Sequence, residues 1–522
     1  MKKILNFRNW KLVIIGMAAF FASSLPYLYG FSRQKAESIF LGRSVVNSAD
    51  TYVFLSNIIS VKDGQIVVPN LYTTESREPF LIKPTYIIVG IIAELSGTSP
   101  LLLYHLARLV SAIAFVIILW KFIGLFVKRE AERLFALVIV LSSSGLGFLL
   151  HRYFPASIDT WVPESNTFFS LIEAPHFIIT QTLLLGSIML ILKFIDIRKW
   201  KYLVFASVLT TLVILEHPFM LPFVFLFPAS LFFMFIKTDK ISEKFGPLIK
   251  FFILPIIAVL VIYRFSFLTV SGRLMNSQNI LTTPSFENII SGYGLLLPLA
   301  ILGFFNSNFK KRENSILAVW IVLSFILIYM PFSFQRRLLE GVHIPISIMA
   351  AGGILFIFSR MKTKLGKYIF LTAAIIVLSL TNINNVNIMI EAFGKDAGEQ
   401  LIYYIDRDEY EGMKWLSSHS NAGDAILANA YYSNILPGIT GRFVYLGHRI
   451  QTYKPILKQH YFDQFMQASN TVYRQKFLKE NGINYIFFGK NDPYNQFRKS
   501  IEILGSVKIA WSKNGVEILK VY

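Results

Sequence analysis

Cysteine is absent from the 522 residues of this sequence, so there is no disulfide framework, no thiolate metal site and no thiol nucleophile. Familiar catalytic signatures are missing as well: there is no P-loop, G-x-G-x-x-G, H-E-x-x-H or G-x-S-x-G. Heptads, clear internal repeats and long low-complexity segments are also lacking. Cytosolic nucleotide chemistry therefore has no support in the sequence.

Apolar residues are what the sequence has in excess. They make up 54% of the chain, aromatic residues make up 15%, and the mean hydropathy is +0.53. This composition is too apolar for a soluble protein and indicates a polytopic membrane protein. The net charge of +20 does not indicate a nucleic-acid partner, because Lys and Arg stand in short runs between apolar segments, where they set topology.

The basic runs predict the orientation of the chain. Residues 1–11 carry four Lys or Arg before an apolar first helix, which places the N-terminus inside. The apolar piece at residues 85–95 is shorter than the roughly 17 residues of a spanning helix. If that piece does not span, six inside segments carry three or four Lys or Arg each, and four short outside loops carry none to two. If it does span, the positive-inside rule fails throughout, so we interpret it as part of the first outer loop.

The sequence thus predicts an α-helical polytopic protein of the plasma membrane. We expect a transmembrane domain at residues 1–383 with a first outer loop at 32–99, and an extracytoplasmic α/β domain at 384–522. About eleven spanning helices are expected, roughly at residues 12–30, 101–127, 131–150, 172–195, 201–216, 217–237, 246–268, 291–309, 315–332, 343–359 and 367–383.

The tail has the mixed pattern of a small α/β domain. Its apolar positions predict a helix around residues 410–416, a long helical stretch at 461–479, and strands at 425–428, 443–446 and 485–488. Residues 507–511 and 516–521 flank Lys513-Asn514-Gly515, which predicts a terminal hairpin because Asn-Gly is a strong turn signal.

Under this topology all eight histidines fall on the outer side, together with Arg108, Glu164, Glu173 and other charged residues at helix ends. Charges at such depths tend to face a wet cavity or a partner. Snorkelling to the headgroups is the alternative for any single one of them, but the whole set on one face favours an outward-facing polar cavity. The histidines lack an i, i+4 pair, so we expect no dedicated zinc site among them.

The first candidate cluster is Asp50-Thr51-Tyr52 with Lys83 in the first outer loop. An aspartate held near a membrane surface among apolar side chains can act as a general base. The alternative is that Asp50 is the N-cap of a helix over residues 52–59. No cofactor is required by the pattern, although Asp50 leaves room for a divalent cation.

A second cluster lies in the loop 159–176, which offers donors and acceptors for a polyol: Asp159, Glu164, Asn166, Glu173 and His176. An ordinary capped connection between helices is the alternative.

The third cluster is Arg336-Arg337, on the outer side where the positive-inside rule disfavours it. Paired arginines can clamp a phosphate bidentately, and a lipid phosphate lies at this depth. Binding of bulk anionic headgroups is the alternative.

Several stretches resemble the membrane-embedded GT-C glycosyltransferases of the protein O-mannosyltransferase and aminoarabinose-transferase type (glycosyltransferase family 39-like), in a prokaryotic branch. The likeness is carried by an acid in the first outer loop, Lys83-Pro84, G-T-S-P-L-L-L-Y-H-L-A-R-L-V-S-A-I, W-V-P-E-S-N-T-F, E-A-P-H-F, and G-R-F-V-Y-L-G-H followed by Gln451-Thr452. It covers most of the chain diffusely and is nearly silent on substrate.

This resemblance implies an inverting hexosyl- or pentosyltransferase. It would move a sugar from a polyprenyl-phosphate donor to a hydroxyl on a glycan, lipid or protein at the outer face. By the likeness Asp50 matches the catalytic acid of the first loop, and Arg336 and Arg337 match the loop that holds the carrier phosphate. The remaining outer-side candidates would bind substrate: Tyr52, Lys83, Arg108, Asp159, Glu164, Asn166, His176 and His217.

One departure and two alternatives accompany this expectation. Several relatives carry two adjacent acids in the first loop, whereas Thr51 follows Asp50 here, so a second acid would come from Glu164 or Asp159. A transporter or lipid flippase should place ionisable residues near the midplane and often shows inverted repeats. A polysaccharide ligase or polymerase is also an outer-face enzyme, and could share the arginines without needing the Asp50 loop.

Overall fold

The computed structural model describes residues 10–65, 67–80, 83–237, 240–306, 311–399 and 402–522. The chain forms two compact units, each built from pieces that are far apart in sequence. Unit 1 comprises Met1–Pro26, His105–Val261 and Ile280–Met389. Unit 2 comprises Tyr27–Tyr104, Ile262–Asn279 and Ile390–Tyr522.

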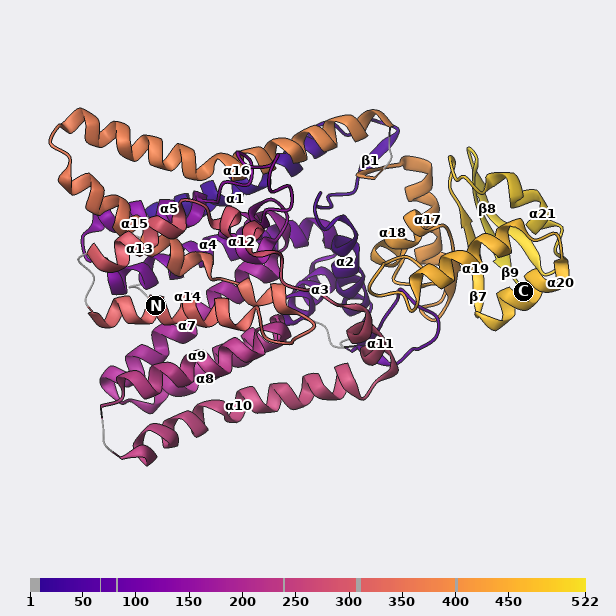
Figure 1. The fold of residues 1–522 in the computed structure, drawn as a ribbon. Helices are drawn as coiled ribbons and strands as arrows, with labels where there is room; N and C mark the ends of the chain where they lie inside the picture. The colour runs from indigo at the N-terminus through magenta and orange to yellow at the C-terminus, as the bar shows by residue number, and fades with distance from the viewer. Residues whose placement is uncertain (1–9, 66, 81–82, 238–239, 307–310, 400–401) are drawn as a thin grey trace. The chain divides into compact units, whose positions relative to one another are not determined.

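Unit 1 is helical (Figure 1). Its main helices are α1 (Trp10–Ser32), α4 (Pro100–Phe126), α5 (Glu130–Ser142), α7 (Pro175–Ile197), α8 (Trp200–Glu216), α9 (Leu221–Phe235), α10 (Ile241–Phe267), α12 (Phe286–Tyr293), α13 (Leu296–Asn306), α14 (Lys311–Leu327), α15 (His343–Arg360) and α16 (Lys364–Glu399). Helices α1, α4, α10 and α16 continue into unit 2.

Among the described residues, seven helical stretches are long and apolar enough to cross a membrane, or eight if the bent pair α12 and α13 is one span. Helices α8 and α14 coincide with two expected spans, but each has only 17 residues. A polytopic helical protein is thus confirmed at this level, whereas the count of eleven remains a prediction.

Three expected helices have clearly different bounds. The helix expected at 131–150 ends at Ser142, since Ser144 turns away and donates its backbone N–H and hydroxyl to Leu378 O. The one expected at 291–309 is interrupted at Gly294, whose φ of 48° is in the left-handed region, and the two parts meet at 67°. Helix α16 runs on to Glu399, past the end expected at 383.

Small residues bring α13 and α15 close together. A Cβ added at Gly303 would overlap the carbonyl oxygen of Met349, and one added at Gly353 would overlap that of Leu299. Side chains at either position would push the two backbones apart. This is the small-residue packing by which membrane helices gain contact area.

Short elements link the ends of the unit 1 helices. These are η1 (Ile158–Thr160), η2 (Pro163–Ser165), α6 (Thr167–Glu173), η3 (Pro218–Met220) and η4 (Gln335–Leu339). Elements η2 and η3 each contact η4, so three connections that are far apart in sequence meet at one place.

Unit 2 combines the segment between α1 and α4 with the tail. The first contributes β1 (Ser38–Phe40), α2 (Ser48–Lys62), β2 (Val68–Pro69), β3 (Pro79–Phe80) and α3 (Pro84–Ser96), and α11 (Val270–Gln278) follows α10. At 13 residues, α3 is as short as the sequence indicated. Strand β1 pairs antiparallel with β4 (Tyr404–Asp406), which joins the first outer loop to the tail.

The tail holds a five-stranded sheet in the order β6-β5-β7-β9-β8. Its elements are α17 (Arg407–His419), β5 (Ala425–Leu427), α18 (Ala430–Thr440), β6 (Phe443–Val444), α19 (Pro455–Gln467), α20 (Thr471–Glu480), β7 (Ile483–Phe488), η5 (Asn495–Phe497), α21 (Arg498–Glu502), β8 (Val507–Lys513) and β9 (Val516–Val521). The expected strands and the Asn-Gly hairpin are confirmed, whereas the helical stretch expected at 461–479 is two helices.

Alternate side chains of β7 point to opposite faces of the sheet. Ile486 and Phe488 belong to the apolar core that α19, α20 and α21 form against the sheet. Phe487 points to the opposite face, where its ring lies 5.2 Å from that of Tyr432 in α18. Strand β7 is therefore buried on both faces, as expected for a strand with an almost continuous apolar run.

Helix α2, which carries Asp50, packs closely against the tail. A Cβ added at Gly438 of α18 would lie 2.9 Å from the carbonyl oxygen of Tyr52, so only glycine allows this approach. Contacts thus group the first outer loop with residues 390–522 in unit 2. The division into domains at residue 384 stays a prediction.

Candidate functional site

Asp50 lies in the first turn of α2, on unit 2. The N-cap of this helix is Asn47 and Asp50 is its third residue, so the N-cap interpretation of Asp50 is wrong. The helix dipole stabilises a negatively charged carboxylate in the first turn, and because Asn47 is the N-cap, the Asp50 side chain does not have to cap the helix. Its side chain is 41% exposed, which leaves it accessible to a reactant.

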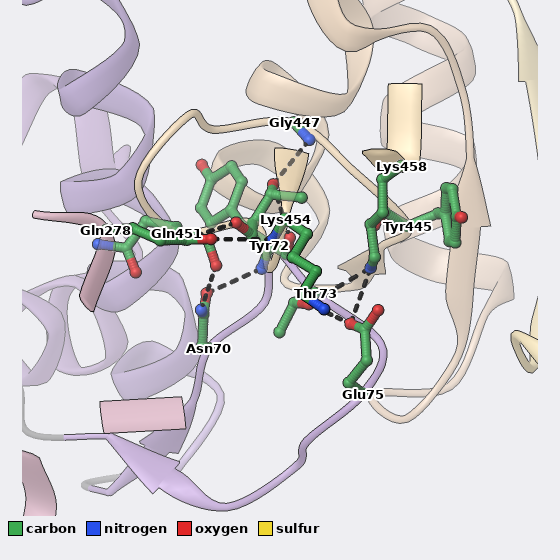
Figure 2. A network of polar contacts seen from close by, with 11 residues as sticks. Asn70, Tyr72, Thr73, Glu75, Gln278, Tyr445, Gly447, Gln451, Lys454 and Lys458 are labelled. Atoms are coloured by element: carbon green, nitrogen blue, oxygen red, sulfur yellow. Dashed lines mark hydrogen bonds and ion pairs between the residues drawn. The ribbon is translucent and has the colours of Figure 1, made fainter. Parts of the chain in front are cut away.

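His448 reaches Asp50 from the tail. Its Nε2 lies 2.8 Å from Asp50 Oδ1, and its side chain is only 6% exposed. The loop that carries His448 follows β6 and is fastened to the first outer loop: Asn70 Nδ2 donates to Gln451 O at 2.7 Å, and Thr452 Oγ1 donates to Tyr72 O at 2.9 Å (Figure 2).

Tyr52 and Lys83, the other two predicted residues of the first outer loop, occupy defined positions in the fold. Tyr52 is buried, its hydroxyl donates to Leu41 O at 3.2 Å, and burial raises the pKa of this phenol. Lys83 is the residue before α3, whose helix starts at Pro84. The buried Arg43 satisfies its guanidinium on Ser48 O, Ile402 O and Asn434 Oδ1, and burial lowers its pKa.

A second polar contact in unit 2 ties the first outer loop to α19. Lys458 Nζ lies 2.8 Å from Glu75 Oε2 and donates to Tyr445 O at 2.6 Å (Figure 2). Burial lowers the pKa of Lys458, and the Glu75 carboxylate opposes this shift. This ion pair is nearly buried on the lysine side and supports the same loop–tail junction as His448.

An open groove of about 600 Å³ is lined by the His448 loop, α11 and α19. Arg449 and Ile450 form part of its wall, next to His448 in sequence, and Ile456 and His460 form another part. Ile456 is 87% exposed. Arg449 is also exposed, and the described residues offer it no hydrogen bond or ion pair.

The two predicted phosphate-binding arginines lie in unit 1, in η4. The guanidinium carbon of Arg336 is 4.6 Å from the ring centroid of Trp161, and that of Arg337 is 4.2 Å from the ring centroid of Phe219. Both side chains are half-buried. An aromatic face holds a guanidinium in plane and leaves its N–H edge to bind a planar or tetrahedral anion.

We call Arg336, Arg337, His217 and Glu340 the arginine cluster. Glu340 is buried one residue after η4, where Gln181 Nε2 donates to it at 2.8 Å and His217 Nδ1 lies 3.4 Å away. The ring centroids of His176 and His217 are 5.9 Å apart. His176 and His217 therefore lie together, and η3, which follows His217, contacts η4, which carries the arginines. The outward-facing polar cavity expected from the sequence stays a prediction.

In the loop 159–176, Asp159 and Asn166 have clear structural contacts, whereas Glu164 has no assigned role. Asp159 is fully buried, where it accepts Ser157 Oγ at 2.6 Å and Gly147 N at 3.2 Å, and burial raises its pKa to about 6. Asn166 caps α6 by accepting Phe169 N at 3.0 Å, so the capped-connection interpretation holds for this residue. Glu164 is buried in η2, which contacts η4, and among the described residues its Oε2 has no hydrogen-bond partner.

Arg108 contacts the backbone of the same loop. It is buried in α4 and donates to Leu171 O at 2.9 Å and to Ser23 O at 3.4 Å. In the part of the chain that the structure describes, no group of three or more His, Asp or Glu side chains is arranged to hold a metal ion.

Sequence reasoning did not identify the partners of the candidate residues. Glu340 and Gln181 were not singled out for a role, nor were Trp161 and Phe219, and nothing in their spacing would have joined them. His448 stood in a stretch that carries the family resemblance, G-R-F-V-Y-L-G-H, but its contact with Asp50 spans 398 residues.

No protein-family model matches the sequence, and no curated protein matches it significantly. Solved structures do match. ArnT from Cupriavidus metallidurans, bound to undecaprenyl phosphate, is 9% identical with a TM-score of 0.54, over 96% of this chain and 97% of that one. The Archaeoglobus fulgidus oligosaccharyltransferase in its apo form is 12% identical with a TM-score of 0.53, over 94% of this chain and 70% of that one.

The arabinofuranosyltransferase AftD from Mycobacteria is 12% identical with a TM-score of 0.51; the match covers 96% of this chain and 40% of AftD. All three neighbours are GT-C glycosyltransferases. The chain has the GT-C fold. The resemblance inferred from the sequence is confirmed at this level, and the identities of 9–12% carry the fold alone.

Proposed function

We propose that this GT-C protein is a membrane glycosyltransferase that moves a sugar from a polyprenyl-phosphate donor to a hydroxyl acceptor at the outer face, with inversion. The observation that carries the proposal is the accessible carboxylate of Asp50 in the first outer loop of a GT-C fold. The ArnT neighbour, solved with undecaprenyl phosphate, supports a carrier of the same chemical class.

In this proposal Asp50 takes the proton of the acceptor hydroxyl as its oxygen attacks the anomeric carbon. A positioned general base contributes about 10²–10⁴-fold. The bond between the anomeric carbon and the carrier phosphate breaks at the same time, and its electron pair goes to the phosphate oxygen. Because phosphate is a good leaving group, no general acid is required.

Arg336 and Arg337 are proposed to hold the carrier phosphate, whose negative charge grows as the bond breaks. Their aromatic supports are the reason for this assignment, since stacking on Trp161 and Phe219 fixes both guanidinium planes. Bulk headgroup binding would not need such fixed planes. Glu340 lies close by in sequence and is buried, which keeps the local charge near balance.

The acceptor is proposed to lie in the groove beside the His448 loop, with its hydroxyl directed to Asp50. Arg449 favours an acceptor with a negatively charged group beside it, the carboxylate of Asp463 in the same lining favours hydroxyl groups, and Ile456 favours an apolar part. An Arg449→Glu variant should raise the acceptor KM and leave the carrier KM unchanged. An unchanged acceptor KM would remove the groove from the proposal.

The finer topology belongs to the same proposal: about eleven spans, an inside N-terminus and an extracytoplasmic tail. The distribution of Lys and Arg supports it, because the six expected inside segments hold 22 of these residues and the four short expected outside loops hold 4. A reporter fused after Tyr522 should be active outside the plasma membrane. Activity on the cytoplasmic side would overturn this topology.

The decisive experiment is incubation of the purified protein with a panel of polyprenyl-phosphate hexoses and pentoses plus mixed glycan, lipid and peptide acceptors. Consumption of one carrier with release of polyprenyl phosphate is expected. Transport of an intact carrier across liposomes, without its consumption, would instead identify a flippase. Dependence on a pre-assembled oligosaccharide carrier would identify a ligase.

A further inference from the structure

A histidine of the tail completes the surroundings of Asp50. We propose that His448 is a positioning residue for Asp50, an inference that rests on the proposed function. Its imidazole lies between the catalytic carboxylate and the backbone of its own loop. Nδ1 is 3.2 Å from the N–H groups of both Ile450 and Gln451, and Nε2 is 2.8 Å from Asp50 Oδ1.

These partners fix the tautomer. The two backbone N–H groups can only donate, so Nδ1 accepts and the ring hydrogen is on Nε2. His448 Nε2–H therefore donates to Asp50 Oδ1. A hydrogen bond to one carboxylate oxygen sets the rotation of the group, and with it the direction in which the other oxygen meets an acceptor.

The loop that holds His448 is unusually well fastened for a surface connection. Gln278 of α11 donates from Nε2 to Ile450 O at 3.0 Å and to Thr452 O at 2.9 Å, and its Oε1 accepts Lys454 N at 2.9 Å. Thr452 Oγ1 also accepts a hydrogen bond from Gly447 N at 3.0 Å. The imidazole thus has little freedom to lose when the reaction begins.

Asp50 and His448 differ in solvent exposure, and this difference indicates which of them can contact the acceptor. Asp50 is 41% exposed and can meet a reactant, whereas His448 is 6% exposed and lies with its ring 5.9 Å from that of Tyr72. A buried imidazole whose Nδ1 is already occupied does not take the acceptor proton itself. During transfer the proton passes from the acceptor hydroxyl to Asp50, and His448 keeps its own hydrogen throughout.

In this proposal the packing of the tail on the first outer loop contributes to catalysis, because it brings His448 to Asp50. Separating the tail from α2 would leave Asp50 without its orienting donor. The alternative is that the contact only fastens two segments together, so the experiment has to separate orientation from fastening.

His448→Phe keeps the ring volume and removes the donor, and should lower kcat by about 10- to 100-fold, the range of a hydrogen bond to a charged group. The carrier KM should not change. His448→Gln places an amide N–H near the position of Nε2 and should recover part of kcat. His419→Phe is the matched control, because His419 is an exposed histidine stacked on Trp415 at the end of α17.

A double-mutant cycle on kcat distinguishes a role in orienting Asp50 from a role in only holding the two segments together. If His448 acts through Asp50, His448→Phe should have no further effect on kcat in the Asp50→Asn background. Equal losses in both backgrounds, or an unchanged kcat in the single variant, would overturn the inference. Thermal unfolding of each variant in detergent shows whether it folds, and His448→Gln serves if His448→Phe does not.

The two proposals fail differently. Wild-type activity in Asp50→Asn would defeat the proposed function's mechanism and this inference with it. A dead Asp50→Asn beside a fully active His448→Phe would defeat only the role of His448.

Discussion

His448 donates a hydrogen bond to Asp50, although 398 residues separate the two in the chain. The contact links α2 of the first outer loop to the connection between β6 and α19 in the tail. The acid nominated by the sequence therefore has a defined helix position, a defined partner and an accessible face. In the proposed function, the same contact gives the tail a part in the chemistry.

The first prediction concerns Asp50 itself. Asp50→Asn keeps the size of the side chain and can still accept from His448, but it cannot take a proton at neutral pH. We expect kcat for sugar transfer to fall by about 10²–10⁴-fold with a nearly unchanged carrier KM, measured as polyprenyl phosphate released. Asp63→Asn, at the other end of α2, is the matched control and should retain wild-type activity. Undiminished transfer in a folded Asp50→Asn would remove the general-base assignment.

The second prediction concerns the arginine cluster. Arg336→Ala and Arg337→Ala should each raise the carrier KM by about tenfold or more, because each removes a charge-assisted hydrogen bond to phosphate. Lysine at either position should restore only part of the affinity, since its ammonium lacks the planar fork that stacks on Trp161 or Phe219.

Arg152→Ala is the control for this pair, because Arg152 is an exposed arginine on the loop before η1. If both cluster variants have wild-type carrier KM values, the phosphate site lies elsewhere.

The sequence predicted the long helices and the sheet strands well, because hydropathy and the period of two are local signals. The breaks were harder to predict. Helix α5 stops where Ser144 bonds to Leu378, more than 200 residues away, and no local pattern signals that partner. The sequence likewise placed the Arg336-Arg337 connection and His217 on the same side of the membrane. The contacts of Glu340 could not be predicted, because they depend on how η3 and η4 pack.

The third prediction concerns pH and Asp159. Its pKa is about 6 in the folded protein against an ordinary 3.8, so the folded state binds this proton more tightly than the unfolded state. Stability from this group is complete below about pH 4, decreases as the pH rises to about 6, and is constant above that. The two-unit difference corresponds to about 3 kcal/mol.

Asp159→Asn should remove most of this decrease, measured as thermal or denaturant unfolding in detergent between pH 4 and 7. The amide can still accept from Gly147 N, and the hydroxyl of Ser157 can rotate to accept from the new N–H. Asp63→Asn, at an exposed carboxyl, should keep the wild-type slope. A slope that survives in Asp159→Asn would assign the pH dependence to other groups.

The last prediction tests the close approach of α13 and α15. Gly303→Ala places a methyl group against Met349 O, a backbone atom that cannot move without shifting α15. Overpacking of this kind costs about 1–3 kcal/mol, so the unfolding transition in detergent should move to clearly lower temperature. Gly246→Ala in α10 is the matched control: nothing lies within 4 Å of its added Cβ, and alanine is the better helix former. The control should be neutral or more stable, and equal stability of both variants would mean that these helices are not packed backbone to backbone.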